Sequence, residues 1–185
     1  MRLFIAINFN NDTRARLIAL QDELRLRSKR GRFSTPDNLH LTLVFLGECD
    51  AKQAANVKVV LDALKFDAFE IAVERVGRFR REGSDIWWAG LRESKSLLDA
   101  QRDLAGNLRA AGFEVERRKF SPHITLARDV ATDASPKVIV PFSESVTSID
   151  LMKSERIAGK LTYTVIYRHR NSELLHRFAP RNDNV

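Results

Sequence analysis

The amino-acid sequence predicts a mixed α and β fold in a single domain with two similar halves, and three observations support this prediction. Short apolar segments of strand length alternate with amphipathic segments long enough for helices. The length of 185 residues and the hydrophobic fraction of 44% suit one domain with a packed core. The motif His-apolar-Thr-Leu occurs twice, starting at His40 and at His123, 83 positions apart. A duplicated half-domain would place the two motifs symmetrically about a cleft.

The first half of the chain is expected to alternate strands with helices. In chain order we predict a buried strand at 3–9, a helix at 12–27, a polar turn at 29–32, a loop at 34–38, a strand from His40 to Gly47 and a helix at 51–64. Asp50 and Gln53 have the spacing of a capping box, in which each side chain binds the backbone N–H of the other residue.

The second half is expected to repeat this alternation around His123. In chain order we predict a strand at 69–76, a basic turn at 78–84, a strand at 86–91, a helix at 94–111, the second histidine strand, and strands at 137–142, 146–152 and 161–167. Gly112 is suited to follow the C-terminus of its helix. The polar tail from Ala179 is expected to be loosely ordered.

Each motif places an imidazole beside a hydroxyl on a strand with an apolar back. Side chains alternate between the two faces of a strand, so His40 shares a face with Thr42, and His123 shares one with Thr125. The opposite faces are expected to carry Leu39, Leu41, Leu43 and Phe45 in the first copy, and Phe120, Pro122, Ile124 and Leu126 in the second. Such a strand is a rigid support for polar chemistry.

Charge and cysteine content indicate the class of partner and the compartment. The net charge of +7 and the pI near 9.9 favour anionic partners, nucleic acid or phosphate compounds, although a merely soluble basic surface is the alternative. Cys49 is the single cysteine, which excludes an intrachain disulfide and fits a reducing cytoplasm. The apolar run at the N-terminus is too short for a signal peptide, and no segment approaches the roughly 20 apolar residues of a membrane span. We therefore expect a soluble, cytoplasmic protein.

The two motifs and their flanks resemble a known family. Residues 38–48 resemble the first signature of the 2H phosphoesterases, residues 121–128 resemble the second, and shorter pieces at 2–7, 88–90 and 151–154 fit as well. The nearest branch is the RNA 2′,3′-cyclic phosphodiesterases, also called 2′-5′ RNA ligases. The resemblance covers nearly the whole chain and implies a bilobal α+β domain. Each lobe would have an antiparallel sheet backed by helices, with both motifs in the cleft between the lobes.

Two histidines and two threonines suit hydrolysis of a phosphodiester. A base must deprotonate the attacking water and an acid must protonate the leaving oxygen, from opposite sides of phosphorus. Imidazole titrates near pH 6.5, so one ring can be neutral while the other is protonated. The hydroxyls of Thr42 and Thr125 can donate to the non-bridging phosphate oxygens.

The roles of the two histidines follow from the resemblance alone. It implies that His40 donates a proton to the leaving 3′ oxygen and that His123 accepts a proton from water, which leaves a 2′-phosphate. With a 5′-hydroxyl in place of water, the reverse reaction would form a 2′-5′ bond. Arg128 matches the second signature and could hold a phosphate oxygen. Strict alternation puts it on the face opposite His123, so it needs a strand end or a twist to reach the site.

Other candidates have weaker support from the sequence. Basic clusters that either steer RNA or form a solvated face are Arg75, Arg78, Arg80 and Arg81, and Arg117, Arg118 and Lys119. Trp87 and Trp88 point to opposite faces of their strand, so we expect one in the core and one that could stack on a base. His169 and His176 have no partner motif and are predicted to lie on the surface.

Cofactor chemistry is not indicated by the sequence. Two histidines with threonines are too few ligands for a catalytic zinc, and no glycine-rich phosphate loop is present, so we expect neither a metal nor another cofactor. The leading hypothesis is a monomeric, metal-independent phosphodiesterase that acts on RNA with 2′,3′-cyclic phosphate ends and binds no membrane. The alternatives are the same chemistry on small cyclic nucleotide phosphates or 2′-5′ oligonucleotides, and a non-catalytic RNA-binding module.

Overall fold

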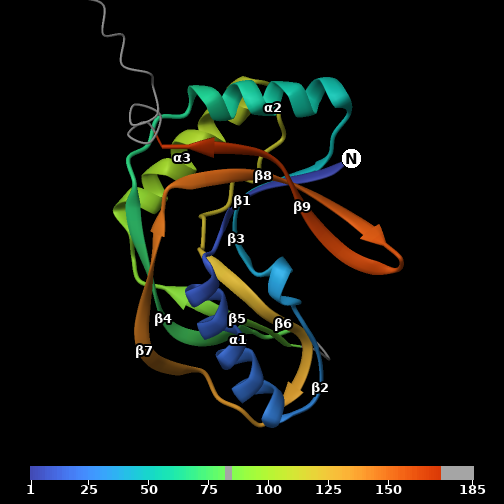
Figure 1. The fold of residues 1–185 in the computed structure, drawn as a ribbon, viewed down its shortest axis with the longest axis vertical. Coiled ribbons are helices and arrows are strands. Elements are labelled where there is room, and N and C mark those ends of the chain that lie inside the picture. Colours follow the sequence, from blue (N-terminus) through green and yellow to red (C-terminus); the bar gives the residue numbers. More distant parts are fainter. Residues whose placement is uncertain (82–84, 172–185) are drawn as a thin grey trace, which may run out of the picture.

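The structure is a computed structural model that describes residues 1–81 and 85–171, and it confirms an α+β fold built on antiparallel strands (Figure 1). Two lobes can be distinguished, each named here after the motif histidine that it carries. The His40 lobe contains β1 (Arg2–Asn8), β3 (His40–Glu48), β8 (Ser148–Ile157), β9 (Lys160–Arg170), α2 (Ala51–Ala63) and α3 (Lys95–Ala110). The His123 lobe contains β2 (Ser28–Phe33), β4 (Phe69–Phe79), β5 (Asp85–Leu91), β6 (His123–Thr132), β7 (Lys137–Val146) and α1 (Asn11–Leu26).

The two lobes meet where β3 pairs with β6. The strand order is β7-β4-β5-β6-β3-β1-β8-β9, with β2 paired to β6 outside this path. The β3–β6 pairing involves Leu41 and Ile124, whereas β8 and β9 pair along their full length. The two expected sheets are therefore the two halves of one continuous sheet, which are joined through one residue pair of β3 and β6.

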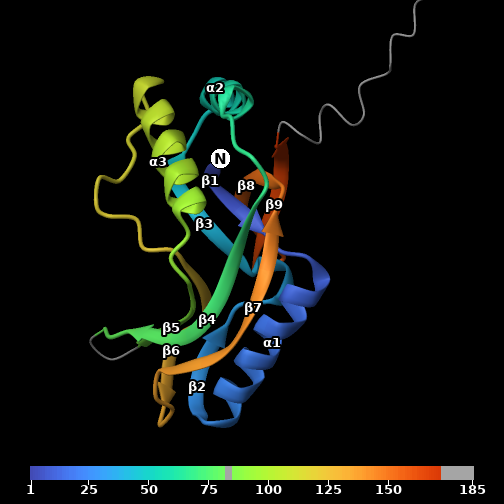
Figure 2. The same ribbon diagram turned by 90° about the vertical axis from the view of Figure 1, so that its left-hand side faces the viewer.

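The helices cover different lobes. In Figure 1 α2 and α3 lie over the His40 lobe at the top, while α1 lies at the bottom. Figure 2 shows α1 alongside β2 and β7, and α1 also contacts β6. None of the helices in residues 1–81 and 85–171 is long and apolar enough to cross a bilayer.

The helix ends follow local signals in the sequence. The Asp50 carboxylate accepts the Gln53 N–H at 2.7 Å, and the Gln53 side chain accepts the Asp50 N–H at 2.9 Å, which confirms the capping box. Asn10 caps α1, with its side chain 2.8 Å from the Thr13 N–H. Gly112 follows α3 with a φ of +88°, a left-handed conformation that glycine adopts without steric cost, as expected.

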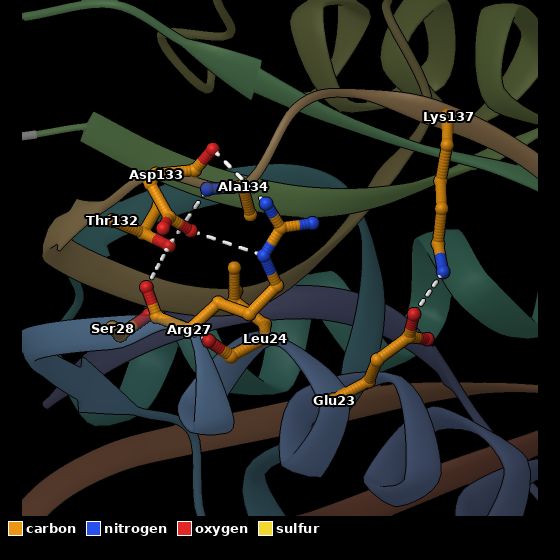
Figure 3. A network of polar contacts seen from close by, with 8 residues as sticks. All are labelled: Glu23, Leu24, Arg27, Ser28, Thr132, Asp133, Ala134 and Lys137. Carbon is orange, nitrogen blue, oxygen red and sulfur yellow. Dashed lines mark hydrogen bonds and ion pairs between the residues drawn. The ribbon is translucent and has the colours of Figure 1, made fainter.

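A polar network fixes the C-terminal end of α1 against the β6–β7 connection (Figure 3). Arg27 Nε donates to the Asp133 carboxylate at 3.0 Å, and the Thr132 hydroxyl donates to the Arg27 carbonyl at 2.6 Å. Lys137 forms an ion pair with Glu23 one turn earlier on α1. Because β2 begins directly after Arg27, this network also sets the position of β2 beside β6.

The predicted polar turn at 29–32 is wrong, because these residues belong to β2. Ser28 pairs with Thr132 and Phe33 with Ala127, so β2 is an edge strand on β6. Its composition misled the prediction, since charged residues are common on edge strands, where they discourage pairing with other chains. The strand predicted at 69–76 is also longer, because Arg78 and Phe79 pair with Trp87 and Ile86.

The last three strands are longer than predicted, and Val146 lies in β7 rather than in β8. The tail from Ala179, the histidine at 176 and residues 82–84 of the predicted turn lie outside the described residues. His169 is buried rather than on the surface. It is 8% exposed, and its Nε2 lies 2.8 Å from the Leu64 carbonyl, a helix-end acceptor that a local sequence pattern cannot reveal.

A β-bulge in β3 overturns one detail of the expected alternation. Ile5 pairs with Val44 and Ala6 with Thr42, so Leu43 is an extra residue in the ladder. The bulge reverses the faces beyond it: Val44 is buried, whereas Phe45, predicted on the apolar face, is 50% exposed beneath the Arg2 guanidinium.

Candidate active site

The two motifs lie at the starts of β3 and β6 and face the same side of the junction. Leu41 and Ile124 are opposite each other and are both fully buried. Directly opposed residues of an antiparallel pair share a face, and side chains alternate along each strand. The motif histidines and threonines next to this pair therefore share the other face, where all four are half-buried: His40, Thr42, His123 and Thr125.

Both imidazole rings are held in the same way by the backbone. His40 Nδ1 lies 2.7 Å from the Asn38 carbonyl oxygen, and His123 Nδ1 lies 2.8 Å from the Ser121 carbonyl oxygen. A carbonyl oxygen only accepts hydrogen bonds, so each neutral ring carries its proton on Nδ1 and leaves Nε2 with a lone pair. Each ring thus has one nitrogen available for proton transfer.

The two Nε2 atoms have different neighbours. His40 Nε2 lies 2.9 Å from the Thr42 hydroxyl oxygen. His123 Nε2 has no hydrogen-bond partner among residues 1–81 and 85–171. The two rings therefore have equivalent backbone contacts at Nδ1 but different surroundings at Nε2, the atom that can exchange a proton.

Aromatic side chains pack against each imidazole from its own lobe. The His40 ring lies 4.9 Å from Phe4 and 5.2 Å from Tyr163, the latter edge-on. The His123 ring lies 5.1 Å from Phe79 in an edge-on arrangement. These rings restrict imidazole rotation and water access. Sequence reasoning missed all three, because they come from β1, β9 and β4 and carry no motif.

Asn38 links His40 to the β9 strand. Its carbonyl accepts from His40, while its side-chain amide donates to the Leu161 carbonyl at 2.8 Å and accepts from the Tyr163 N–H at 3.2 Å. This residue belongs to the first sequence signature, but its partners on β9 are more than a hundred positions away. Local patterns could not reveal this link.

The surroundings lower the pKa of both imidazoles. Burial is the largest cause of the lowered pKa of His40; the hydrogen bond to Asn38 acts in the opposite direction, and the charges of Arg128 and His123 lower it further. Burial is also the largest cause of the lowered pKa of His123, opposed by the hydrogen bond to Ser121 and assisted by Arg128 and Arg118. The neutral rings are therefore favoured in the unliganded site.

Arg128 lies on the histidine face because of a β-bulge in β6. Trp87 pairs with Ala127 and Trp88 with Thr125, so Leu126 is an extra residue. Leu126 and Ala127 are both fully buried, and the alternation resumes with Arg128 exposed on the face of Thr125. The strict alternation that placed Arg128 on the opposite face is wrong for this reason. The electrostatic effect of Arg128 on both imidazoles agrees with this position.

One of the two tryptophans lies in the core, as predicted. Trp87 is 1% exposed, whereas Trp88 is half-buried on the face of Thr125, 5.3 Å from the Phe79 ring. Gly77 and Gly90 leave room for the Trp88 indole: a Cβ at Gly90 would lie 2.6 Å from a ring carbon, and one at Gly77 would overlap the ring even more. The indole therefore lies flat against the sheet.

The basic clusters differ in their relation to the site. Arg78 and Arg75 form ion pairs with Asp85 at 3.0 Å and Glu74 at 2.9 Å. Arg118 pairs with Glu116 at 2.8 Å, yet it also lowers the pKa of His123. The remaining members of the clusters are exposed: Arg80, Arg81, Arg117 and Lys119. Within residues 1–81 and 85–171, no three His, Cys, Asp or Glu side chains are grouped so that they could hold a metal ion.

Comparison with known proteins identifies the family. The sequence profile described as LigT like Phosphoesterase matches residues 7–88 and 91–163. This chain belongs to that family. Its membership in the 2H phosphoesterases, predicted from the two motifs, is confirmed.

Relatives match the LigT-like chain over most of its length. The RNA 2′,3′-cyclic phosphodiesterase of Escherichia coli K12 is 31% identical over 173 residues, which cover 90% of this chain and 94% of the relative. The protein of the same name from Thermus thermophilus is 32% identical over 176 residues, covering 90% and 88%. The crystal structure of E. coli LigT complexed with 3′-AMP superposes with a TM-score of 0.83 at 28% identity, over 92% of this chain and 98% of that one.

Proposed function

We propose that this LigT-like phosphoesterase hydrolyses RNA 2′,3′-cyclic phosphate ends to 2′-phosphates by metal-independent acid–base catalysis. The observation that carries the proposal is the pair of imidazoles on one face of the lobe junction, each with Nδ1 held by a backbone carbonyl, so that Nε2 is the nitrogen that can exchange a proton. His40 Nε2 lies 2.9 Å from the Thr42 hydroxyl oxygen, whereas His123 Nε2 has no such partner in the described part of the chain. The names of the relatives support the substrate class.

The proposed reaction assigns one proton transfer to each ring. His123 Nε2 accepts a proton from water, whose oxygen attacks phosphorus, while the bond from phosphorus to the 3′ oxygen breaks. His40 in its protonated form donates its Nε2 proton to that oxygen, which leaves a 3′-hydroxyl and a 2′-phosphate. The lowered pKa of both rings suits the base but disfavours the protonated acid. The negative charge of a bound phosphate opposes this effect, because an anion raises the pKa of a neighbouring imidazolium.

Thr42, Thr125 and Arg128 are proposed to hold the non-bridging phosphate oxygens. The threonines share the histidine face, and Arg128 reaches it through the bulge at Leu126. Donors already in place where charge develops stabilise the transition state without reorganisation. The same geometry with a 5′-hydroxyl in place of water would carry out the reverse reaction and form a 2′-5′ linkage.

A panel of defined substrates tests the proposal. An RNA oligomer with a 2′,3′-cyclic end, a nucleoside 2′,3′-cyclic phosphate and a 2′-5′-linked oligomer are incubated separately, and the products are identified by chromatography. We expect the cyclic end to yield a terminal 2′-phosphate. A 3′-phosphate product would reverse the assignment of His40 as donor to the 3′ oxygen. Turnover of the 2′-5′ linkage alone would overturn the proposed substrate class.

The proposal extends to assembly and compartment. We propose that the whole chain acts as one domain and as a monomer in the cytoplasm. The single cysteine, Cys49, is free and buried, which agrees with a reducing compartment. Sedimentation equilibrium at the concentrations used in the assay measures the oligomeric state, and a mass of twice the chain would contradict it.

A further inference from the structure

Two arginines of β2, Arg30 and Arg32, extend the basic surface from Arg128 along the edge of the His123 lobe. Arg32 is the register partner of Arg128 on β6, so the two side chains project from the same face. Gly31 faces the other way, because a Cβ there would lie 3.1 Å from the Phe33 ring and 3.2 Å from the core residue Val130. Arg30 and Arg32 therefore project together on the Arg128 side.

The opposite face of β2 is already covered. Phe33 packs against the core, and the Arg25 guanidinium of α1 lies 4.2 Å from the centre of its ring. The Arg128 side of β2, in contrast, is open. Residues 30–32 and Asp129 line a depression of about 460 Å³, and both arginines are exposed.

An ion pair orients the nearer arginine without hiding it. Arg32 pairs with Asp129, a residue with a φ of 54° at an irregular step of the β6 ladder. The Arg32 side chain remains 74% exposed, so part of its guanidinium faces solvent. Arg30, Arg32 and Arg128 are all exposed on this face, so they form a strip of basic side chains that leads away from the histidines.

We propose that the Arg30–Arg32 edge of β2 binds the phosphates of the RNA chain that precede the terminal cyclic phosphate. This inference rests on the proposed function, because the terminal phosphate must lie between the histidines for the chain to reach β2 through Arg128. It names the substrate as an RNA strand several nucleotides long rather than a mononucleotide.

The geometry of the edge suits a nucleic-acid backbone. Alternate residues on one face of a strand are about 6.6 Å apart. This spacing is close to that of successive phosphates in an extended single strand, so Arg30 and Arg32 can each meet one phosphate. Discouraging the association of edge strands, the common role of such charges, would not require the row to continue in register into the candidate active site.

The test compares salt dependence in matched variants. Each neutralised phosphate of a single strand contributes about 0.7 to the slope of log affinity against log salt, so Arg30→Gln/Arg32→Gln should reduce the slope by about 1.4. Between 50 and 200 mM salt, wild-type affinity should then fall about sevenfold more than that of the variant. The probe is a fluorescent ten-nucleotide single-stranded RNA with a terminal 3′-phosphate, measured by anisotropy.

Two further variants separate location from charge. Lys52→Gln/Arg109→Gln removes the same charge from α2 and α3, at the opposite end of the molecule from β2, and should keep the wild-type slope (Figure 1). Arg30→Lys/Arg32→Lys keeps the charge on β2 and should restore most of the slope. Equal slopes for the β2 glutamine variant and the wild type would overturn the proposal. An equal loss of slope in the Lys52/Arg109 control would also overturn it. A third glutamine variant, Arg117→Gln/Lys119→Gln, removes charge from the other basic cluster, and a loss of slope confined to this variant would overturn the proposal as well.

Turnover of a nucleoside 2′,3′-cyclic phosphate, measured on the same proteins, separates this inference from the proposed function. The β2 variants should lose kcat/KM on a cyclic-ended oligomer at low salt much more than on the mononucleotide. Wild-type protein that turns over neither substrate yet shows the β2-dependent slope would contradict the proposed function alone. Turnover of both substrates, equally affected by the β2 variants, would contradict the β2 assignment alone.

Discussion

Replacement of the two motif histidines measures how far they act as one catalytic unit. Each imidazole has one available nitrogen, because Nδ1 is held at 2.7 Å from Asn38 in one case and 2.8 Å from Ser121 in the other. Each ring can therefore make one of the two proton transfers and cannot replace the other. A positioned general acid or base contributes about 10²–10⁴ to the rate, so each alanine variant should lose about 2.7–5.5 kcal/mol of transition-state stabilisation.

The double variant is the more informative measurement. Independent contributions would multiply to about 10⁴–10⁸, whereas groups that act in one concerted displacement lose most of the effect with the first replacement. We expect His40→Ala/His123→Ala to be within about tenfold of the slower single variant. This expectation follows from the common face of the two rings at the Leu41–Ile124 pair.

The assay is single-turnover hydrolysis of a nucleoside 2′,3′-cyclic phosphate with product quantified by chromatography. His40→Ala also removes a ring packed against Phe4 and Tyr163, so thermal unfolding must be measured beside it. His40→Asn is a second control, because its amide can still donate to the Asn38 carbonyl while offering no titrating nitrogen. Wild-type rates in either folded single variant, or fully multiplicative losses in the double, would refute the paired mechanism.

Three other predictions concern metals, pH and the packing of the Trp88 indole. Activity should persist after dialysis against EDTA, and an activity loss that zinc or manganese reverses would exclude the metal-independent mechanism. Because the pKa of both imidazoles is lowered, both limbs of the kcat/KM profile should lie below pH 6.5, and the anionic substrate should move the kcat profile to higher pH. Arg128→Gln removes a charge that disfavours protonation and should shift the kcat/KM limbs upward; a downward shift would contradict its placement. Gly77→Ala should lift the Trp88 indole off the sheet, which would change the tryptophan fluorescence and reduce kcat/KM. The matched control is Gly106→Ala on α3, where the new Cβ has free space around it. Identical spectra and rates for the two variants would be inconsistent with the packing described.

Local signals in the chain were sufficient for most elements. The three helices lie within one residue of their predicted ends, because caps such as Asp50 with Gln53 depend on residues a few positions apart. The opposite faces of the two tryptophans, and the common face of each His–Thr pair, follow from strand periodicity alone. The segment at 29–32 was predicted as a turn because it is basic and has no apolar pattern. It forms a strand because it pairs with β6.

The candidate site could be proposed from the sequence because its motif is short and repeated, but tertiary structure decided which residues share its face. The residue pattern alone determined that His40 and His123 begin strands with apolar backs, and that each histidine is joined by a threonine two positions later. Only the tertiary structure decided that β3 and β6 meet at one residue pair and that a bulge at Leu126 turns Arg128 to the histidine face. The physical reason is that periodicity reports which side of a strand a residue faces only while the ladder is regular. Bulges and pairing partners depend on contacts between segments far apart in the chain.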